Sequence, residues 1–263
     1  MNEHRRPPVP SWVARSVQGR STTATTQPIR VPVASGLARS LMPATGLGLD
    51  SDAVRTRMVQ RLAAAGITSP LVLQAMGAVE RHRFVDSALV NQAYEDTSLP
   101  IGLGQTISKP SVVARMLELL ADAPGAQDGL GRVLEIGTGC GYQAAVMAKM
   151  TREVYSIERL RGLHEKARTN LRPWRLVNVH LILGDGMQGY AKGAPYAGII
   201  AAAGGDAVPD AWCDQLAIGG RLVAPLVMSA GKQALMVIDK SSHGFKQTVL
   251  EAVNFVPLKS GIA

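Results

Sequence analysis

The chain has 263 residues, of which 46% are hydrophobic and only 4% aromatic, so we expect one large α/β domain with an aliphatic core. Half of the net charge of +8 comes from residues 1–50, where six arginines face Glu3 and Asp50, leaving 22 of the 28 basic and 18 of the 20 acidic side chains for the rest. A body so mildly basic, without a Lys/Arg block, argues against nucleic acid as a partner.

The two cysteines, Cys140 and Cys213, form no C-x-x-C pair, and the five histidines show no ligand spacing. Neither a disulfide framework nor a metal site is therefore expected. No stretch approaches the roughly 18 consecutive apolar residues of a membrane span, and no apolar segment follows Arg5-Arg6 as in a secretory signal. We expect a cytoplasmic protein without membrane contact and, as a working assumption, a monomer.

Residues 1–50 are rich in Pro, Ser, Thr, Gly and Arg and show no sustained periodicity, which predicts a disordered basic extension. The folded domain then spans residues 51–263. Helical periodicity in its first part, residues 51–120, predicts a cap and substrate loop with three helices: 52–65, 69–79 and 111–120.

From residue 121 to 263 the chain alternates short apolar strands with helices, which predicts a doubly wound, mostly parallel sheet with helices on both faces. The last two strands, joined by the turn Ser241–Gly244, should be antiparallel. Ligands bind such sheets at the carboxyl ends of the strands. The seven expected strands are 133–136, 153–158, 179–183, 197–202, 221–226, 234–239 and 248–256, and the helices between them are 142–150, 161–171 and 209–216.

The stretch VLEIGTGCGYQ, Val133–Gln143, runs from a buried strand into three glycines on alternate positions. Gly137, Gly139 and Gly141 remove the Cβ atoms from this turn, so the backbone can lie against a ligand. A dinucleotide fingerprint has the different spacing G-x-G-x-x-G, and Glu135 in the strand would repel a pyrophosphate. A carboxylate there suits a cationic ligand such as S-adenosylmethionine and argues against a NAD-dependent oxidoreductase.

Two further acids stand at strand ends. Glu158 closes the second strand about twenty residues beyond the first glycine, where an acid accepts hydrogen bonds from ribose hydroxyls. Asp185 closes the third strand between two glycines and is well placed for an adenine amino group. Alternatively, the glycines form only a tight turn and the acids are solvated loop ends, but three acid-tipped strands in this order favour a cofactor site.

The segment LPIGLGQTISKP, Leu99–Pro110, is glycine-rich without the lysine of a P-loop. Its polar residues Gln105, Thr106 and Ser108 stand just before a helix, and Ser108 taken alone is better interpreted as the helix cap. Together with Arg83-Phe84-Val85, VLEIGTGCGYQ, SIERL, GDG and the closing NFVPL, this segment resembles the protein-L-isoaspartate O-methyltransferase family. The similarity runs from about Asp52 to the C-terminus.

This resemblance implies a Rossmann-like methyltransferase domain over residues 51–263 that uses S-adenosyl-L-methionine. The methyl group would go to the carboxylate of L-isoaspartyl residues in damaged proteins or peptides, starting their repair through a succinimide. A carboxylate is already ionised at neutral pH, so the reaction needs no general base. The implied catalytic residue is Ser108, the substrate-binding residues are Ile107, Thr106 and Gln105, and the cofactor-binding residues are Glu135, Gly137, Thr138, Gly139, Gly141, Glu158, Asp185 and Gly186.

The chain departs from the family's pattern in the fourth strand. Gly198 stands there in place of an acid, and the run Ala201–Gly205 is small and plain. Two alternatives stay open at this point. One is a methyltransferase for RNA or a small molecule, and the other is a non-catalytic homologue that binds the cofactor without turnover.

Overall fold

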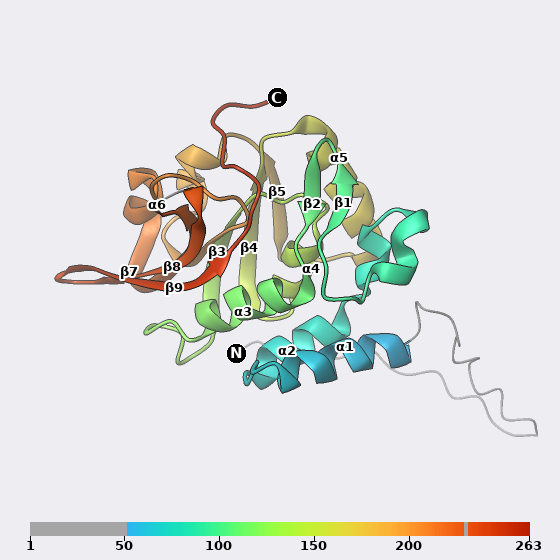
Figure 1. The fold of residues 1–263 in the computed structure, drawn as a ribbon. Helices are drawn as coiled ribbons and strands as arrows, with labels where there is room; N and C mark the ends of the chain where they lie inside the picture. Colours follow the sequence, from blue (N-terminus) through green and yellow to red (C-terminus); the bar gives the residue numbers. More distant parts are fainter. Residues whose placement is uncertain (1–51, 229–230) are drawn as a thin grey trace, which may run out of the picture. The chain divides into compact units, whose positions relative to one another are not determined.

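The computed structural model describes residues 52–228 and 231–263, and the extension predicted for residues 1–50 lies outside these ranges. The strands β3 to β9 form a seven-stranded sheet in the order β5-β4-β3-β6-β7-β8-β9, and Figure 1 shows its place in the fold. Neighbouring strands run parallel from β5 to β7 and antiparallel from β7 to β9, which confirms the predicted fold class. The strands are β3 (Leu130–Ile136), β4 (Thr151–Glu158), β5 (Val179–Leu183), β6 (Tyr196–Ala201), β7 (Leu216–Val227), β8 (Gln233–Ser241) and β9 (Gly244–Val253).

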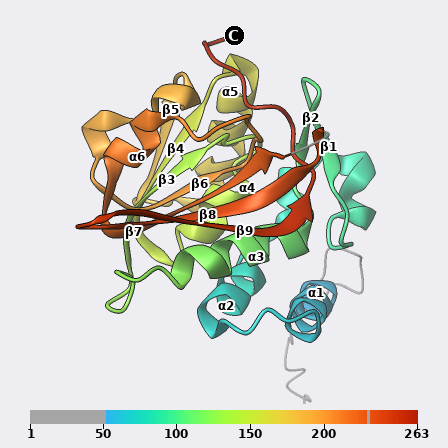
Figure 2. The ribbon, with the colours of Figure 1, turned by 60° about the vertical axis from the view of Figure 1, so that its left-hand side comes forward.

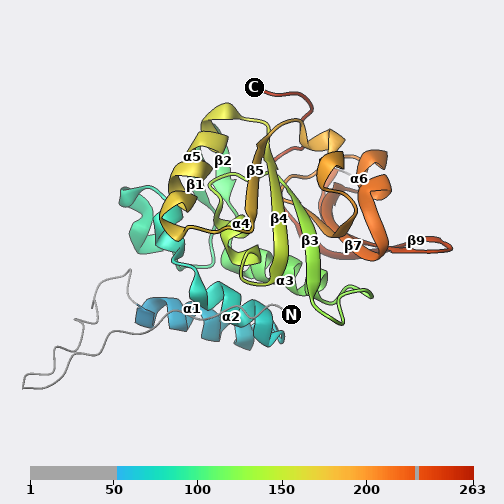
Figure 3. The ribbon, with the colours of Figure 1, turned by 180° about the vertical axis from the view of Figure 1, so that it is seen from behind.

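Helices cover both faces of the sheet, and an apolar cluster fills each space between them. Val133 of β3 belongs to the cluster shared with α3, α4 and α5, while its neighbour Leu134 belongs to the cluster shared with α6, because successive side chains of a strand point to opposite faces. Figure 3 shows α5 on the β5 side of the sheet and α6 on the β7 side. The helices are α1 (Asp52–Ala64), α2 (Pro70–Ala78), α3 (Pro110–Ala121), α4 (Tyr142–Met147), α5 (Arg161–Leu171) and α6 (Asp210–Gln215).

In residues 51–120, where the sequence predicts the cap and substrate loop, α1 and α2 pack against α3, and α2 also packs against α4 (Figure 2). Met58 of α1 and Met76 of α2 are buried. Helix α2 begins at Pro70 because the Ser69 hydroxyl accepts a hydrogen bond from the backbone of the first turn. Glu118 of α3 accepts bonds from the backbone N–H groups of residues 68 and 69, at 2.7 and 2.9 Å, and so fixes these two helices to α3.

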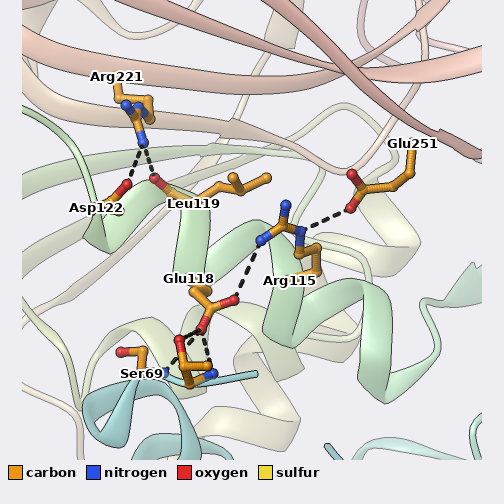
Figure 4. Close-up of polar contacts among 8 residues, drawn as sticks. Ser69, Arg115, Glu118, Leu119, Asp122, Arg221 and Glu251 are labelled. Carbon is orange, nitrogen blue, oxygen red and sulfur yellow. Dashed lines mark hydrogen bonds and ion pairs between the residues drawn. The ribbon is translucent and has the colours of Figure 1, made fainter. Parts of the chain in front are cut away.

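Helix α3 is also fixed to the sheet, as Figure 4 shows for its C-terminal end. Arg221 of β7 donates to the carbonyl of Leu119 at 2.9 Å and pairs with Asp122 at 3.5 Å. Gly198 of β6 lets the helix approach closely, because a Cβ atom at this position would lie 2.8 Å from Cδ1 of Leu120. Helix α3 is therefore fixed in place, and the loop that leads into it is anchored at that end.

The segment before α3 differs from the prediction, which places a substrate loop and no strand between the second and third helices of residues 51–120. A small antiparallel hairpin forms from β1 (Leu99–Gly102) and β2 (Gln105–Ile107). Its apolar side chains alternate, with residues 99, 101 and 107 buried. Leu103 and Gly104 form the turn with positive φ of 52° and 68°. The two strands are too short for the alternation of apolar and polar residues to predict them from the sequence.

Helix α4 is also shorter than predicted, because it ends at Met147 instead of residue 150. The backbone turns there: the N–H of Met150 and the hydroxyl of Thr151 both donate to the carbonyl of Met147, at 2.8 and 3.1 Å. Within residues 52–228 and 231–263, none of the helices has the length and apolar character needed to cross a bilayer.

Candidate functional site

The carboxyl ends of β3, β4, β5 and β6 border a cavity of about 290 Å³, which the β1–β2 hairpin and residues 256–259 also line. This is the edge of the sheet where the sequence predicted a ligand site. Gly141 and Asp185 lie outside the lining. The predicted site residues that line the cavity are Gln105, Thr106, Ile107, Ser108, Glu135, Gly137, Thr138, Gly139, Glu158 and Gly186.

The glycine turn between β3 and α4 needs its glycines for backbone conformation and for space. Gly137, Gly139 and Gly141 have φ values of 92°, 56° and 89°, a region that other residues rarely adopt. A Cβ atom on Gly139 would lie 3.2 Å from Cδ1 of Ile101, so this glycine lets the β1–β2 hairpin close over the turn. A Cβ atom on Gly141 would lie 3.0 Å from Cδ1 of Leu171, so Gly141 serves the approach of α5.

Glu158 ends β4 and holds the glycine turn in place. Its Oε2 accepts a hydrogen bond from the N–H of Gly139 and its Oε1 one from the N–H of Leu160, each at 2.9 Å. The residue is only 5% exposed and lines the cavity. Each carboxylate oxygen has a second lone pair, so the same acid can also accept hydrogen bonds from ribose hydroxyls.

Glu135 lies inside β3 and is fully buried. Burial raises the pKa of its carboxyl group to about 8. One oxygen accepts a hydrogen bond from the hydroxyl of Ser156, which in turn contacts the Thr138 hydroxyl at 2.6 Å. The other oxygen is buried and has no partner in the described part of the chain. A buried carboxylate with an open oxygen fits the ammonium and sulfonium of S-adenosylmethionine, because a cation offsets the cost of burying its charge.

Asp185 follows β5, but its carboxylate already has two backbone partners. One oxygen accepts from the N–H of Met187 at 2.9 Å, and the other accepts from the N–H of Gly261 at 2.8 Å. The C-terminal segment is held again at Ala263, whose N–H donates to the carbonyl of Arg159 at 2.9 Å. The sequence motif NFVPL marked this segment only as part of the resemblance, whereas the structure brings it to the cavity wall.

Ser108 stands between β2 and α3 and lines the cavity. The alternative of a helix cap is not what the structure shows: Lys109 occupies the cap position without a side-chain bond. A carboxylate oxygen of Asp96 accepts from the N–H of Ser111 in the first helical turn instead, at 2.8 Å. No hydrogen bond within residues 52–228 and 231–263 involves the Ser108 hydroxyl, so it is open to a ligand.

A fully buried arginine, Arg81, for which the sequence predicted no role, binds the backbone of Ser108. Arg81 donates to the carbonyl of Ser108 at 2.7 Å and to that of Ala93 at 2.8 Å. Its guanidinium carbon lies 4.8 Å from the ring centre of Tyr142, a residue of the cavity wall. Burial lowers the pKa of Arg81. Nothing in the sequence separates this arginine from its exposed neighbour Arg83, so its contact with Ser108 appears only in three dimensions.

The departure from the family's pattern at Gly198 lies outside the cavity lining, where this glycine packs against α3. Two small residues that follow β6, Ala202 and Ala203, do line the cavity. The plain run after the fourth strand is therefore part of the site wall, whereas the change at Gly198 concerns the packing of a helix.

The parallel sheet, the glycine turn after β3 and the buried acids at Glu135 and Glu158 define a class of protein, the Rossmann-like methyltransferases that use S-adenosylmethionine. The sequence profile described as protein-L-isoaspartate(D-aspartate) O-methyltransferase matches residues 53–263. The chain belongs to this family.

Named relatives and solved structures agree with this assignment. Protein-L-isoaspartate O-methyltransferase of Methylibium petroleiphilum is 61% identical over 227 residues, which are 85% of this chain and 83% of that one. The enzyme of the same name from Leptothrix cholodnii is 60% identical and covers 82% of this chain and 77% of its own.

Among solved structures, a protein-L-isoaspartate O-methyltransferase has a TM-score of 0.71 at 29% identity and covers 79% of this chain and 67% of its own. A beta-aspartate methyltransferase of Plasmodium falciparum in complex with S-adenosyl-L-homocysteine has a TM-score of 0.67 at 26% identity and covers 78% of this chain and 98% of its own. The chain is thus an S-adenosylmethionine-dependent protein carboxyl methyltransferase, and a role in RNA or small-molecule methylation is not favoured.

Proposed function

We propose that the protein methylates the carboxylate of isoaspartyl residues in damaged proteins in the cavity beside Ser108. Glu135 and Glu158 would hold the cofactor there. The observation that carries the proposal is the position of Ser108. It lines both the cofactor cavity and a second hollow on the side of α3, so this one residue borders the proposed places of the methyl donor and of the acceptor.

The chemistry asks for placement rather than for proton removal. S-adenosylmethionine supplies an activated methyl group when it is bound. The acceptor carboxylate is ionised at neutral pH, and the Ser108 hydroxyl donates a hydrogen bond that orients it toward the donor. Apolar side chains from β2, α3 and α5, those of Ile107, Val113 and Leu163, line the same cavity and limit the access of water. A site poor in water favours a reaction in which an anion and a cation give two neutral products.

Arg81 is a positioning residue in this scheme, because it touches the backbone of Ser108 and not the reacting atoms. Its two hydrogen bonds tie the Ser108 carbonyl to η2 (Ser87–Gln92) and its C-terminal neighbour Ala93. Its position over Tyr142 connects the segment that carries Ser108 to the start of α4, which follows the glycine turn. The distance between Ser108 and the cofactor is thereby set by packed side chains, which is what an in-line methyl transfer needs.

The experiment that tests the proposal measures labelled methyl transfer from S-adenosylmethionine to matched peptides that carry either isoaspartate or aspartate at one position. We expect label on the isoaspartyl peptide and none above background on the aspartyl peptide. Equal labelling of both peptides, or tight cofactor binding without transfer to either, would contradict the proposed function.

We also propose that the protein works as a monomer in the cytoplasm, without nucleic acid or membrane partners. Both cysteines are free thiols, Cys140 buried and Cys213 partly so. Burial raises the pKa of Cys140 to about 11, which keeps this residue in the thiol form. Free thiols are typical of a reducing compartment. Fractionation of cells tests the cytoplasmic location, and sizing of the native protein tests the monomeric state.

A further inference from the structure

The second hollow, of about 840 Å³, adjoins the cofactor cavity, and we name it the acceptor groove. One wall is the first half of α3, with Val112 and Arg115, and the other wall is residues 251–256 at the end of β9 and beyond. Residues 65–67, between α1 and α2, lie at its border. The groove and the cavity share four residues: Thr106, Ser108, Ala202 and Val256.

A polypeptide substrate needs such a groove, and this step rests on the proposed function. The acceptor carboxylate lies at Ser108, but the chain that carries it continues beyond the reacting residue. The cofactor cavity is near the lower limit of about 300 Å³ for small-molecule sites, so it leaves little room for more than the cofactor. The residues beside the isoaspartate therefore enter the acceptor groove.

Three charged side chains line the acceptor groove: Lys109, Arg115 and Glu251. Figure 4 shows Arg115 between two carboxylates, with Nε 2.9 Å from Glu251 of β9 and Nη1 3.4 Å from Glu118 of its own helix. The ion pair with Glu251 joins the two walls. Two of the five N–H donors of the guanidinium are used in these contacts, so three remain for a ligand.

Lys109 is a positive charge of the acceptor groove that no ion pair among the described residues neutralises. It is exposed, it follows Ser108 directly, and it belongs to none of the ion pairs formed among the described residues. It lines the groove and not the cofactor cavity. Its charge therefore acts on the substrate residue next to the isoaspartate rather than on the carboxylate that loses its charge in the reaction.

We propose that the acceptor groove selects an acidic side chain beside the isoaspartyl residue, with Lys109 as the specificity-determining residue. Arg115 supplies a second cation whose attraction Glu251 moderates. Because the pairs involved are exposed, the preference is modest and weakens with salt.

The test uses isoaspartyl peptides that differ in one residue beside the isoaspartate, which is Glu, Gln or Lys and is placed on either side of it. KM and kcat are measured for methyl transfer, and the dissociation constants of the same peptides are measured with the protein loaded with S-adenosyl-L-homocysteine. For the unaltered protein at low salt, we expect KM and the dissociation constant to be about two- to five-fold lower for the Glu peptide than for the Lys peptide. We expect kcat to be nearly equal.

Variants of the charged residues locate the effect. Lys109→Glu should reverse the order of the Glu and Lys peptides, and Glu251→Gln should widen the preference for Glu. The matched control is Lys192→Glu, the same change at an exposed lysine just before β6, at the opposite end of the strand from the site. This control should keep the preference of the unaltered protein.

Two results would overturn the proposal: equal affinity for the Glu, Gln and Lys peptides on both sides of the isoaspartate in the unaltered protein, or the same preference in Lys109→Glu as in the unaltered protein. A failure of the proposed function is a different result, because it removes methyl transfer to every isoaspartyl peptide. The binding measurement still decides the preference in that case, since it needs no turnover.

Discussion

On the cofactor side of the site, Glu135 and Glu158 are almost fully buried and bonded to neighbouring groups, whereas on the acceptor side Lys109 and Glu251 are exposed and Arg115 is half-buried. A buried acid with fixed partners accepts one ligand of one charge pattern. Exposed charges on a groove tolerate many partners at small energetic cost. The difference suits a protein that takes one donor molecule and acceptors of varied sequence.

The largest effect should come from Ser108→Ala, which removes the side chain between the two regions. We expect kcat to fall about a hundredfold, the scale for losing one positioned hydrogen-bond donor in a transition state. Cofactor affinity should stay nearly unchanged, since the acids proposed to hold the cofactor, Glu135 and Glu158, are other residues. Steady-state kinetics and calorimetric titration with the cofactor measure the two effects. Ser241→Ala, at the β8–β9 turn, is the control; a parallel loss of cofactor affinity in Ser108→Ala would show that the serine is misassigned.

Glu158→Ala tests the cofactor side alone. It should weaken cofactor binding by about 1–3 kcal/mol, because hydrogen bonds to a charged group are lost and the N–H of Gly139 loses its acceptor. Peptide affinity should change little. Titration calorimetry gives the change directly, and Glu165→Ala on the exposed face of α5 is the matched control. An unchanged cofactor affinity would remove the ribose role from Glu158.

Glu135 makes cofactor binding dependent on pH. Its pKa of about 8 means that the carboxyl group is mostly protonated at neutral pH before the cationic cofactor binds. Binding favours the ionised form, lowers this pKa and releases a proton, so affinity should rise with pH from about 6 to 7.5, by at most about tenfold per unit. Calorimetry in buffers of different ionisation enthalpy counts the proton. Glu135→Gln should abolish the release; a release that persists in this variant comes from another group.

The smallest effect is expected for Asp185→Asn. The oxygens of Asp185 serve the N–H groups of Met187 and Gly261, and an amide oxygen replaces only one of these acceptors. We expect a loss of about 1 kcal/mol in stability, read from the thermal midpoint and compared with Asp128→Asn in an exposed loop. A loss of cofactor affinity well beyond that of stability would instead support the predicted contact with adenine.

The cofactor side could be predicted from the sequence because its pattern is local. A strand, three glycines and a helix follow one another within Val133–Gln143; Glu135 lies in that strand and Glu158 ends the next one. The acceptor side depends on contacts between distant residues. Arg81 meets Ser108 across 27 positions, and Arg115 meets Glu251 across 136. Such contacts leave no periodic signal, and the three-residue strand β2 is too short to leave one either.

Gly198 has a consequence for the engineering of this protein. A side chain at position 198 would press on Leu120 near the end of α3, whose first half carries Arg115 and forms a wall of the acceptor groove. Since packed interiors transmit displacements, a substitution in the middle of the sheet can shift that wall without touching any substrate. A mutant library aimed at new acceptors should therefore include position 198, although this residue lines neither the cavity nor the groove.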